Sequence, residues 1–228
     1  MAILVGIDGT GGDFTPGGAR NQRYDVAFAH SFVRRLCAPN SVNRRYFRGP
    51  VALGGGLLDA ISEGVEFIVG RRKAGDSGPI LLTGYSRGAA GAVAIAKKLQ
   101  RKNLNVSAML LFDCVDRHLF IDAEVIPNNV ENVFHVVRSD ASGSRESFGH
   151  EGLRFRPPTH YPAAYAFMCT HGGMGGTPWI PAPGVSVDDI IDEGGVDGKT
   201  NITYAQDARV SGEIWSFVQP FIQKYGYV

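Results

Sequence analysis

The stretch that decides the fold is Ile80-Leu-Leu-Thr-Gly-Tyr-Ser-Arg-Gly-Ala-Ala90, where the pattern Gly-x-Ser-x-Gly joins an apolar run to an alanine-rich run. The apolar run predicts a buried strand, and the alanine-rich run predicts a helix. A serine at such a tight strand-to-helix turn is typical of a nucleophile elbow, which needs small residues such as Gly84 and Gly88 on both sides. We therefore expect the Ser86 hydroxyl to stand exposed above the carboxyl end of the strand.

Strand and helix patterns alternate on both sides of this turn. Short apolar runs predict strands at residues 2–7, 79–83, 106–112 and 130–137, and residues 44–50 are predicted as a further short strand that ends at a turn. Helical spacing predicts helices at residues 24–36, 57–69 and 87–102 and a last one through residues 214–221. Apolar strands that alternate with helices form parallel sheets covered on both faces. The sequence therefore predicts an α/β fold, a three-layer α/β/α sandwich around a mostly parallel sheet.

The composition fits one globular domain over residues 1–228. With 228 residues and 44% hydrophobic side chains, the chain is long enough to bury a core without disulfides or metals. Lys and Arg number 23 against 22 Asp and Glu, so no long-range field attracts nucleic acid, and we expect none as a partner. The cysteines Cys37, Cys114 and Cys169 are widely spaced and predict reduced thiols rather than a metal site.

The N-terminus carries no pattern that directs export. The apolar run at residues 2–7 has no basic segment before it, and it stops at the glycine-rich turn Asp8-Gly-Thr-Gly-Gly12. We therefore expect a cytoplasmic protein, or one exported by a route without an N-terminal signal peptide. No run of about 18 apolar residues occurs, so no transmembrane segment is expected.

The elbow and four further motifs resemble one known family. Gly84-Tyr-Ser-Arg-Gly-Ala89 resembles the G-F-S-R-G-A elbow of the uncharacterised α/β-hydrolase family that includes type VI secretion phospholipase effectors. The other motifs follow in the family's order: Ile7-Asp-Gly-Thr10, Tyr46-Phe-Arg-Gly-Pro50, Leu111-Phe-Asp-Cys-Val115 and Cys169-Thr-His-Gly-Gly-Met-Gly-Gly176. The resemblance covers about residues 3–176. It implies an α/β-hydrolase-like sheet and hydrolysis of carboxylic esters, with lipid or phospholipid acyl esters as the substrate class and no cofactor.

The chain departs from this family at three positions and in its inserts. Cys114 stands in place of the usual threonine, Cys169 in place of the first glycine of its loop, and Gly173 where an aspartate is common. The large membrane-docking inserts of the effectors are missing from this sequence. Ester hydrolysis is therefore the broader implication of the resemblance, and membrane-lipid hydrolysis is the narrower one.

A catalytic serine needs a histidine within hydrogen-bond reach. His171 lies in a glycine-rich loop late in the chain, where few side chains obstruct an imidazole that reaches over the strand ends, and we predict it as the base. His160 is the alternative. His135 lies inside an apolar strand pattern and His118 directly beyond a strand, so both are predicted to be structural.

Two aspartates compete to orient this histidine. Asp140 follows the later of two strands, the commoner position of the acid in hydrolases of this fold, but it opens Asp-Ala-Ser-Gly143, a sequence typical of a turn. Asp113 ends the strand that follows the elbow helix, and its match to the family's F-D-T-V motif favours it. We predict Asp113 as the acid, with Asp140 and then Asp116 as alternatives.

Two segments are expected to form the oxyanion hole. The Arg87 N–H, at the start of the elbow helix, is one predicted donor. Gly9 and Thr10 follow an early strand in a glycine-rich segment and are predicted to supply the second donor, with a plain turn as the alternative.

These residues together predict a serine esterase or lipase that acts on a small-molecule or lipid ester through an acyl-enzyme on Ser86. An acyltransferase or thioesterase with the same triad is one alternative, and a hydrolase fold kept only for binding is the other. Residues 172–198 carry Trp179 among glycines and are predicted either to close over an acyl chain as a flap or to pack as core. No metal is expected.

Overall fold

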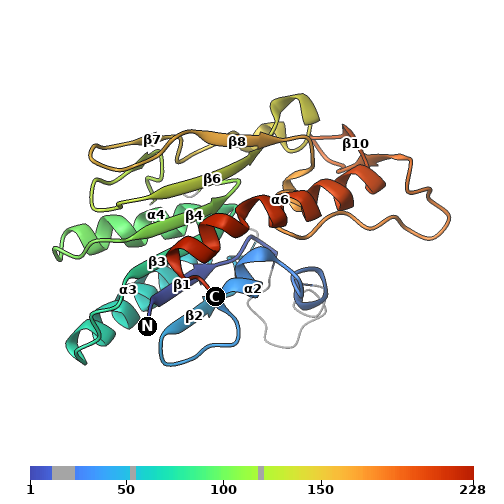
Figure 1. Cartoon of the computed structure of the whole chain (residues 1–228). Coiled ribbons are helices and arrows are strands. Elements are labelled where there is room, and N and C mark those ends of the chain that lie inside the picture. The colour runs from blue at the N-terminus through green and yellow to red at the C-terminus, as the bar shows by residue number, and fades with distance from the viewer. Residues whose placement is uncertain (12–23, 52–54, 118–120) are drawn as a thin grey trace.

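The computed structural model describes residues 1–11, 24–51, 55–117 and 121–228 (Figure 1). Its centre is a six-stranded sheet in the order β2-β1-β3-β4-β6-β8, and every neighbouring pair of strands is parallel. The predicted parallel sheet is confirmed. The strands are β1 (Ile3–Ile7), β2 (Arg44–Phe47), β3 (Ile80–Tyr85), β4 (Ala108–Phe112), β6 (Val133–Arg138) and β8 (Ala164–Phe167).

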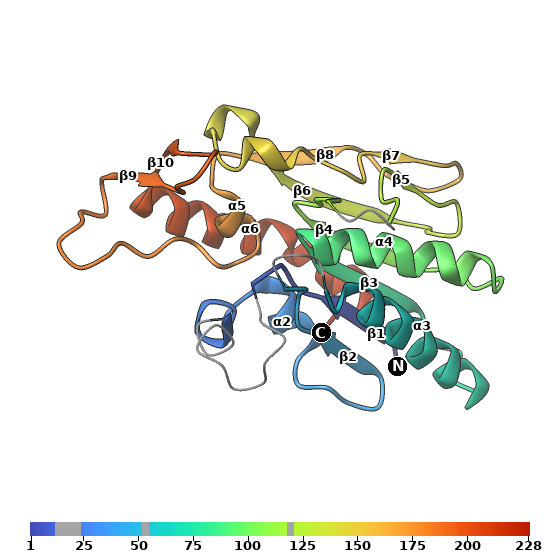
Figure 2. The same ribbon diagram turned by 180° about the vertical axis from the view of Figure 1, so that it is seen from behind.

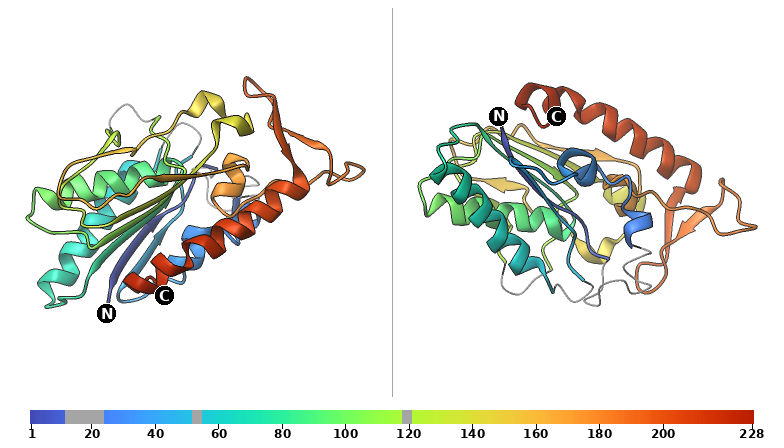
Figure 3. Two further views of the ribbon diagram at one scale, coloured as in Figure 1. Left: turned by 45° about the horizontal axis from the view of Figure 1, so that its top comes forward. Right: turned by 90° about the horizontal axis from the view of Figure 1, so that it is seen from below.

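Helices cover both faces of this sheet (Figures 2 and 3). Side chains alternate along each strand, so Ile3, Val5 and Ile7 of β1 join one core and Leu4 joins the other. The first core lies under α3 and α4 and the second under α2 and α6, which confirms the three-layer α/β/α sandwich. These helices are α2 (Phe32–Cys37), α3 (Leu57–Lys73), α4 (Arg87–Gln100) and α6 (Tyr204–Tyr225).

The chain beyond β4 adds short elements that the sequence patterns did not predict. Two small pairs of strands lie outside the central sheet, one parallel and one antiparallel. Each is too short for an apolar period to be visible in the sequence. These elements are β5 (Val125–Ile126), η1 (Asp140–Ser142), η2 (Glu146–Phe148), β7 (Arg154–Phe155), α5 (His171–Met174), β9 (Ile190–Asp192) and β10 (Lys199–Thr203).

The predicted helix over residues 24–36 is wrong in its middle. The backbone is helical at residues 24–27, and α2 begins only at Phe32. Ser31 caps α2 because its Oγ accepts a hydrogen bond from an amide of the first turn at 3.1 Å. The Phe32 amide donates to Gly175 O at 2.9 Å, outside the helix altogether. A continuous helix would lose both bonds.

The parallel strands bring the chemically active residues to one edge. Asp8 directly follows β1, Ser86 follows β3, Asp113 follows β4, and Arg138 ends β6. Because the carboxyl ends of parallel strands share an edge, these four side chains gather there although they are far apart in sequence. Within the described ranges, no helix combines the length and the apolar character that crossing a bilayer requires. One domain over residues 1–228 stays a prediction.

Candidate active site

Ser86 lies at a sharp turn between β3 and α4. Its backbone has φ 57° and ψ −129°, a conformation that a residue with a Cβ rarely adopts and that stores strain. A Cβ on Gly84 would lie 2.5 Å from Gly88 O, and a Cβ on Gly88 would lie 2.1 Å from Ile7 O. The need for small residues on both sides of the serine is therefore confirmed.

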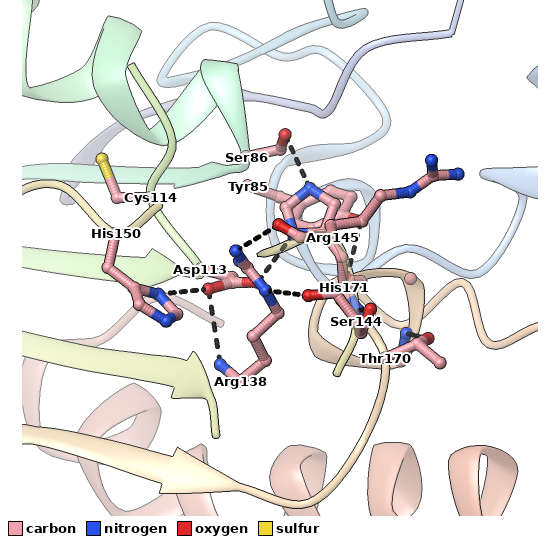
Figure 4. A network of polar contacts seen from close by, with 12 residues as sticks. Tyr85, Ser86, Asp113, Cys114, Arg138, Ser144, Arg145, His150, Thr170 and His171 are labelled. Atoms are coloured by element: carbon pink, nitrogen blue, oxygen red, sulfur yellow. Dashed lines mark hydrogen bonds and ion pairs between the residues drawn. The ribbon is translucent and has the colours of Figure 1, made fainter. Parts of the chain in front are cut away.

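His171 and Asp113 meet Ser86 at the carboxyl edge of the sheet (Figure 4). His171 Nε2 lies 2.9 Å from Ser86 Oγ, and His171 Nδ1 lies 2.6 Å from Asp113 Oδ2. All three side chains are buried, and Ser86 is only 4% exposed, so the expectation of an exposed hydroxyl is wrong. Phe148 lines the same pocket as Ser86, and its ring is edge-on to His171 at 5.2 Å between centroids.

The two alternative acids lie away from His171. The side chain of Asp140 is 94% exposed, and its Oδ1 lies 3.0 Å from His150 Nε2. Asp116 Oδ2 accepts a hydrogen bond from Ala123 N at 2.9 Å. The structure thus brings Asp113, and neither of these two, into contact with the imidazole of His171.

The alternative histidines lie elsewhere in the fold. His160 is exposed, and its amide donates to Glu131 O at 2.8 Å in an extension of the sheet. His135 is fully buried in β6, where its Nδ1 lies 2.9 Å from Tyr161 Oη. Burial lowers the pKa of His135 to about 4, which suits the neutral, structural histidine predicted there. His118 lies outside the described residues.

Asp113 is fully buried, and a guanidinium and an imidazole contact its carboxylate beside His171. Arg138 Nη1 lies 2.6 Å from Asp113 Oδ2, and His150 Nδ1 lies 3.2 Å from Asp113 Oδ1. Burial alone would raise the pKa of Asp113, but the contacts with His150, His171 and Arg138 outweigh burial and hold that pKa well below its usual range. The acid that touches His171 is therefore ionised at neutral pH.

Arg138 is a site residue that the sequence analysis did not identify. It is 3% exposed and also donates to three backbone carbonyls, with Nε 2.7 Å from Ser144 O and Nη2 2.9 Å from Arg145 O and 3.0 Å from Gly149 O. These bonds attach the segment that carries Phe148 to the carboxylate of Asp113. The sequence feature that could have identified Arg138 is its charge at the end of an otherwise apolar strand pattern.

The loop that carries His171 is fixed from several directions. Asp207 of α6 accepts from Thr170 N at 2.7 Å and from Thr170 Oγ1 at 2.9 Å. The His171 amide donates to Ser144 Oγ at 2.8 Å, and Tyr85 Oη donates to His171 O at 2.8 Å. The imidazole is therefore held by its backbone as well as by its two ring contacts.

The departure from the family at Gly173 has a steric reason. A Cβ at Gly173 would lie 2.4 Å from Asp207 Oδ1, so the space that an aspartate would need there is already filled by the carboxylate of Asp207. Burial raises the pKa of Asp207, and the amides of Thr170 and Trp179 that donate to it partly offset this rise. Asp207 was not predicted, because it lies in a helix far along the chain from His171.

The pocket above Ser86 has a volume of about 270 Å³. Thr10 and Arg87, two of the predicted oxyanion residues, line it, and Thr10 Oγ1 is buried without a hydrogen-bond partner among the described residues. Gly9 is not among the described lining residues, and its amide donates to Asp8 Oδ1 at 3.0 Å. The structure therefore favours Thr10 over Gly9 as the loop donor. Gly12 lies outside the described residues.

A buried carboxylate fixes this loop. Asp8 is fully buried, and its Oδ2 accepts from Tyr46 Oη at 2.9 Å and from Ser31 Oγ. Burial raises the pKa of Asp8 to about 6, against the opposing effect of these hydrogen bonds. Tyr24 Oη also donates to Gly9 O at 3.3 Å, so side chains hold both the amide and the carbonyl of Gly9.

The flap predicted at residues 172–198 does not cover Ser86. Met174 is buried in the core, and Trp179 lines a separate apolar groove with Phe32 and Trp215. This groove shares no described lining residue with the Ser86 pocket. Of the two alternatives predicted for residues 172–198, the structure therefore does not support the one in which Trp179 forms a wall of the Ser86 pocket.

Comparisons with known proteins add no family assignment. No protein-family model matches the sequence, and no curated protein matches it. An uncharacterized protein from Pseudomonas aeruginosa is 16% identical with a TM-score of 0.41, and the match covers 77% of this chain but only 42% of that one. An acetyl xylan esterase, solved as an iodinated complex, is 11% identical with a TM-score of 0.32 over 97% of both chains. At such low scores, neither likeness bears on function.

Proposed function

We propose that this protein is a serine hydrolase that cleaves carboxylic esters through an acyl-enzyme on Ser86. One observation carries the proposal: Ser86 Oγ, His171 and the ionised Asp113 form a continuous series of contacts of 2.9 and 2.6 Å at a strained strand-to-helix turn. A serine that only capped a helix would need no buried base and acid behind it.

Each side chain has one task in the proposed reaction. His171 Nε2 takes the proton of Ser86 Oγ as this oxygen attacks the ester carbonyl, and then returns a proton to the departing alcohol. Asp113 accepts the Nδ1–H of His171, which fixes the tautomer and stabilises the imidazolium. A water molecule then attacks the acyl-enzyme with His171 again as the base, and Ser86 is regenerated.

The oxyanion of the tetrahedral intermediate is assigned to Arg87 and Thr10. The backbone N–H of Arg87 begins α4, where helix geometry directs amides toward the elbow. Thr10 lines the same pocket, and its hydroxyl, which has no hydrogen-bond partner among the described residues, is assigned as the second donor. Preorganised donors of this kind stabilise charge that develops in the transition state and therefore raise kcat.

The sequence resemblance supports esters of lipids or phospholipids as the first substrates to test. The same triad would serve an acyltransferase or thioesterase, in which only the acceptor or the leaving group differs. Hydrolysis is proposed because water is the default acceptor for an acyl-enzyme in an aqueous pocket.

A fluorophosphonate probe tests the proposal directly, because it labels only an activated serine. We expect labelling and turnover of 4-nitrophenyl acetate by the parent chain, and loss of both in Ser86→Ala and in His171→Ala, with turnover lower by about 10⁴- to 10⁶-fold. Ser216→Ala, a change at an exposed serine of α6, is the matched control and should behave as the parent. An unlabelled parent chain would show that the fold only binds its ligand.

A further inference from the structure

Three arginines line the small pocket above Ser86. They are Arg87, Arg117 and Arg145, and no carboxylate stands among the described residues that line this pocket. Three guanidinium groups therefore lie at the place where a substrate's ester group must lie.

Two of these guanidinium groups share one aromatic ring. Arg117 Cζ lies 5.2 Å and Arg145 Cζ lies 5.6 Å from the ring centroid of Phe148. Arg145 is also held by Glu193 at 3.7 Å and by Asp197 at 3.1 Å, two acids outside the pocket lining. The guanidinium of Arg145 is thus fixed in place before any ligand binds, and Arg117 remains exposed to an incoming molecule.

Two of these guanidinium groups affect each other's charge. Burial lowers the pKa of Arg87, and the charge of Arg117 lowers it further, so the two guanidinium groups act on each other through the pocket. An anion between them would relieve this repulsion. A planar guanidinium offers paired donors that match the oxygens of phosphate, sulfate and carboxylate.

We propose that the substrate is an ester that carries an anionic group, namely a phosphate, sulfate or carboxylate, a few bonds away from the ester carbonyl, and that Arg117 and Arg87 bind this group beside Ser86. The inference rests on the proposed ester hydrolysis and narrows its substrate class. An uncharged ester would gain no charge–charge attraction from the guanidinium groups, and among the described lining residues it would meet apolar surface at Tyr85, Val115 and Phe148.

Matched pairs of esters test this selectivity. The first pair places the charge on the acyl side: 4-nitrophenyl hydrogen glutarate against 4-nitrophenyl methyl glutarate. The second pair places it on the alcohol side: 1-butanoylglycerol 3-phosphate against 1-butanoylglycerol. In at least one pair we expect the anionic member to have a kcat/KM at least about 10-fold higher, and this ratio should fall as salt is added.

Variants of the arginines assign the effect to the pocket. Arg117→Gln should reduce the ratio of kcat/KM for the anionic ester to that for the neutral ester by about 10-fold, because it removes one charge-assisted contact. Arg101→Gln, at the exposed far end of α4, is the matched control and should keep the parent's preference. An equal preference in Arg117→Gln and the parent would overturn the assignment to this pocket.

A binding measurement separates this inference from the proposed function. In a calorimetric titration, phenyl phosphate should bind to the Ser86→Ala variant and phenol should not. Adding Arg117→Gln to this variant should lower its affinity for phenyl phosphate by about 10-fold. Binding without any ester turnover in the parent would contradict the hydrolase and retain the anion site. Turnover of neutral esters with no phosphate binding and no anionic preference would overturn the anion site and retain the hydrolase.

Discussion

Replacement of Asp113 by asparagine is the sharpest test of the proposed acid. Asp113 Oδ2 accepts hydrogen bonds from His171 Nδ1 and Arg138 Nη1, and Asp113 Oδ1 accepts one from the Arg138 amide. An amide has only one oxygen, so one side of the new side chain must present N–H groups to donors. If the amide nitrogen faces His171, Nδ1 must accept, and Nε2 then carries the proton and cannot take the one from Ser86.

The opposite orientation also lowers activity. With its oxygen toward His171, the amide keeps the tautomer but carries no charge to stabilise the imidazolium, so we expect kcat to fall by about 10³- to 10⁴-fold. Arg138 would lose its buried anionic partner at the same time, which costs about 3 kcal/mol of stability. The backbone adds no further cost, because φ at Asp113 is 47° and asparagine tolerates this region.

The assay compares two variants that differ only in the aspartate changed. Burst-phase and steady-state turnover of 4-nitrophenyl acetate, together with urea unfolding, are measured for Asp113→Asn and for Asp140→Asn. Asp140 is exposed and touches His150 rather than His171, so its variant should stay within about threefold of the parent, as for other surface changes. A larger loss of kcat in Asp140→Asn than in Asp113→Asn would refute the assignment of the acid.

Three further outcomes follow from the structure. Because burial raises the pKa of Asp8 from 3.8 to about 6, its contribution to stability is complete below its unfolded pKa and is lost as pH rises through the folded one. Asp8→Asn should remove about 3 kcal/mol of this pH dependence, measured by urea unfolding at about pH 3 and about pH 8. Gly88→Ala should lower the free energy of unfolding by more than about 3 kcal/mol, because its Cβ would strike backbone oxygens. Gly70→Ala, at an open position in α3, should raise the free energy of unfolding by about 0.5 to 1 kcal/mol, and both changes are measured by urea unfolding. Trp179→Ala should leave the ratio of kcat/KM for 4-nitrophenyl decanoate and acetate unchanged, because its side chain lines another groove, and a selective loss on the decanoate would contradict the separation of the two.

The inner strands of the central sheet could be predicted because they are short runs of apolar residues separated by turn residues. The run at residues 80–85 ends in a glycine turn, and its helix begins at once, so pattern and structure agree there to within a residue or two. β8 escaped prediction because Ala164–Phe167 is a half-buried edge strand of four residues. The helix predicted through Ser31 failed because a cap and a long-range hydrogen bond outweigh local helical spacing.

The candidate site was predictable only in part. Ser86 stands in a local motif, the late glycine-rich loop indicated His171, and the family resemblance favoured Asp113. The catalytic roles of these residues stay predictions. Arg138 left one signal in the sequence, a charge at the end of an apolar strand pattern, but its contact with Asp113 depends on the tertiary fold. Asp207 could not be predicted, because only the tertiary fold brings it near Thr170. The choice between Gly9 and Thr10 likewise depends on a hydrogen bond to Asp8 that no sequence pattern reveals.

The hydrogen bonds from Thr170 to Asp207 affect the order in which the parts of the site come together as the chain is synthesised. The elbow and its neighbours β3, α4 and β4 are contiguous in the chain, whereas His171 comes 85 positions after Ser86, and Asp207 another 37 positions after Thr170. A nascent chain can therefore complete the strained serine turn while its base is still untethered. Reactivity should emerge abruptly, at the moment α6 docks, rather than grow in step with the secondary structure. A chain released from the ribosome before Asp207 would have the strained turn at Ser86, but its His171 would not be held in place to activate the serine.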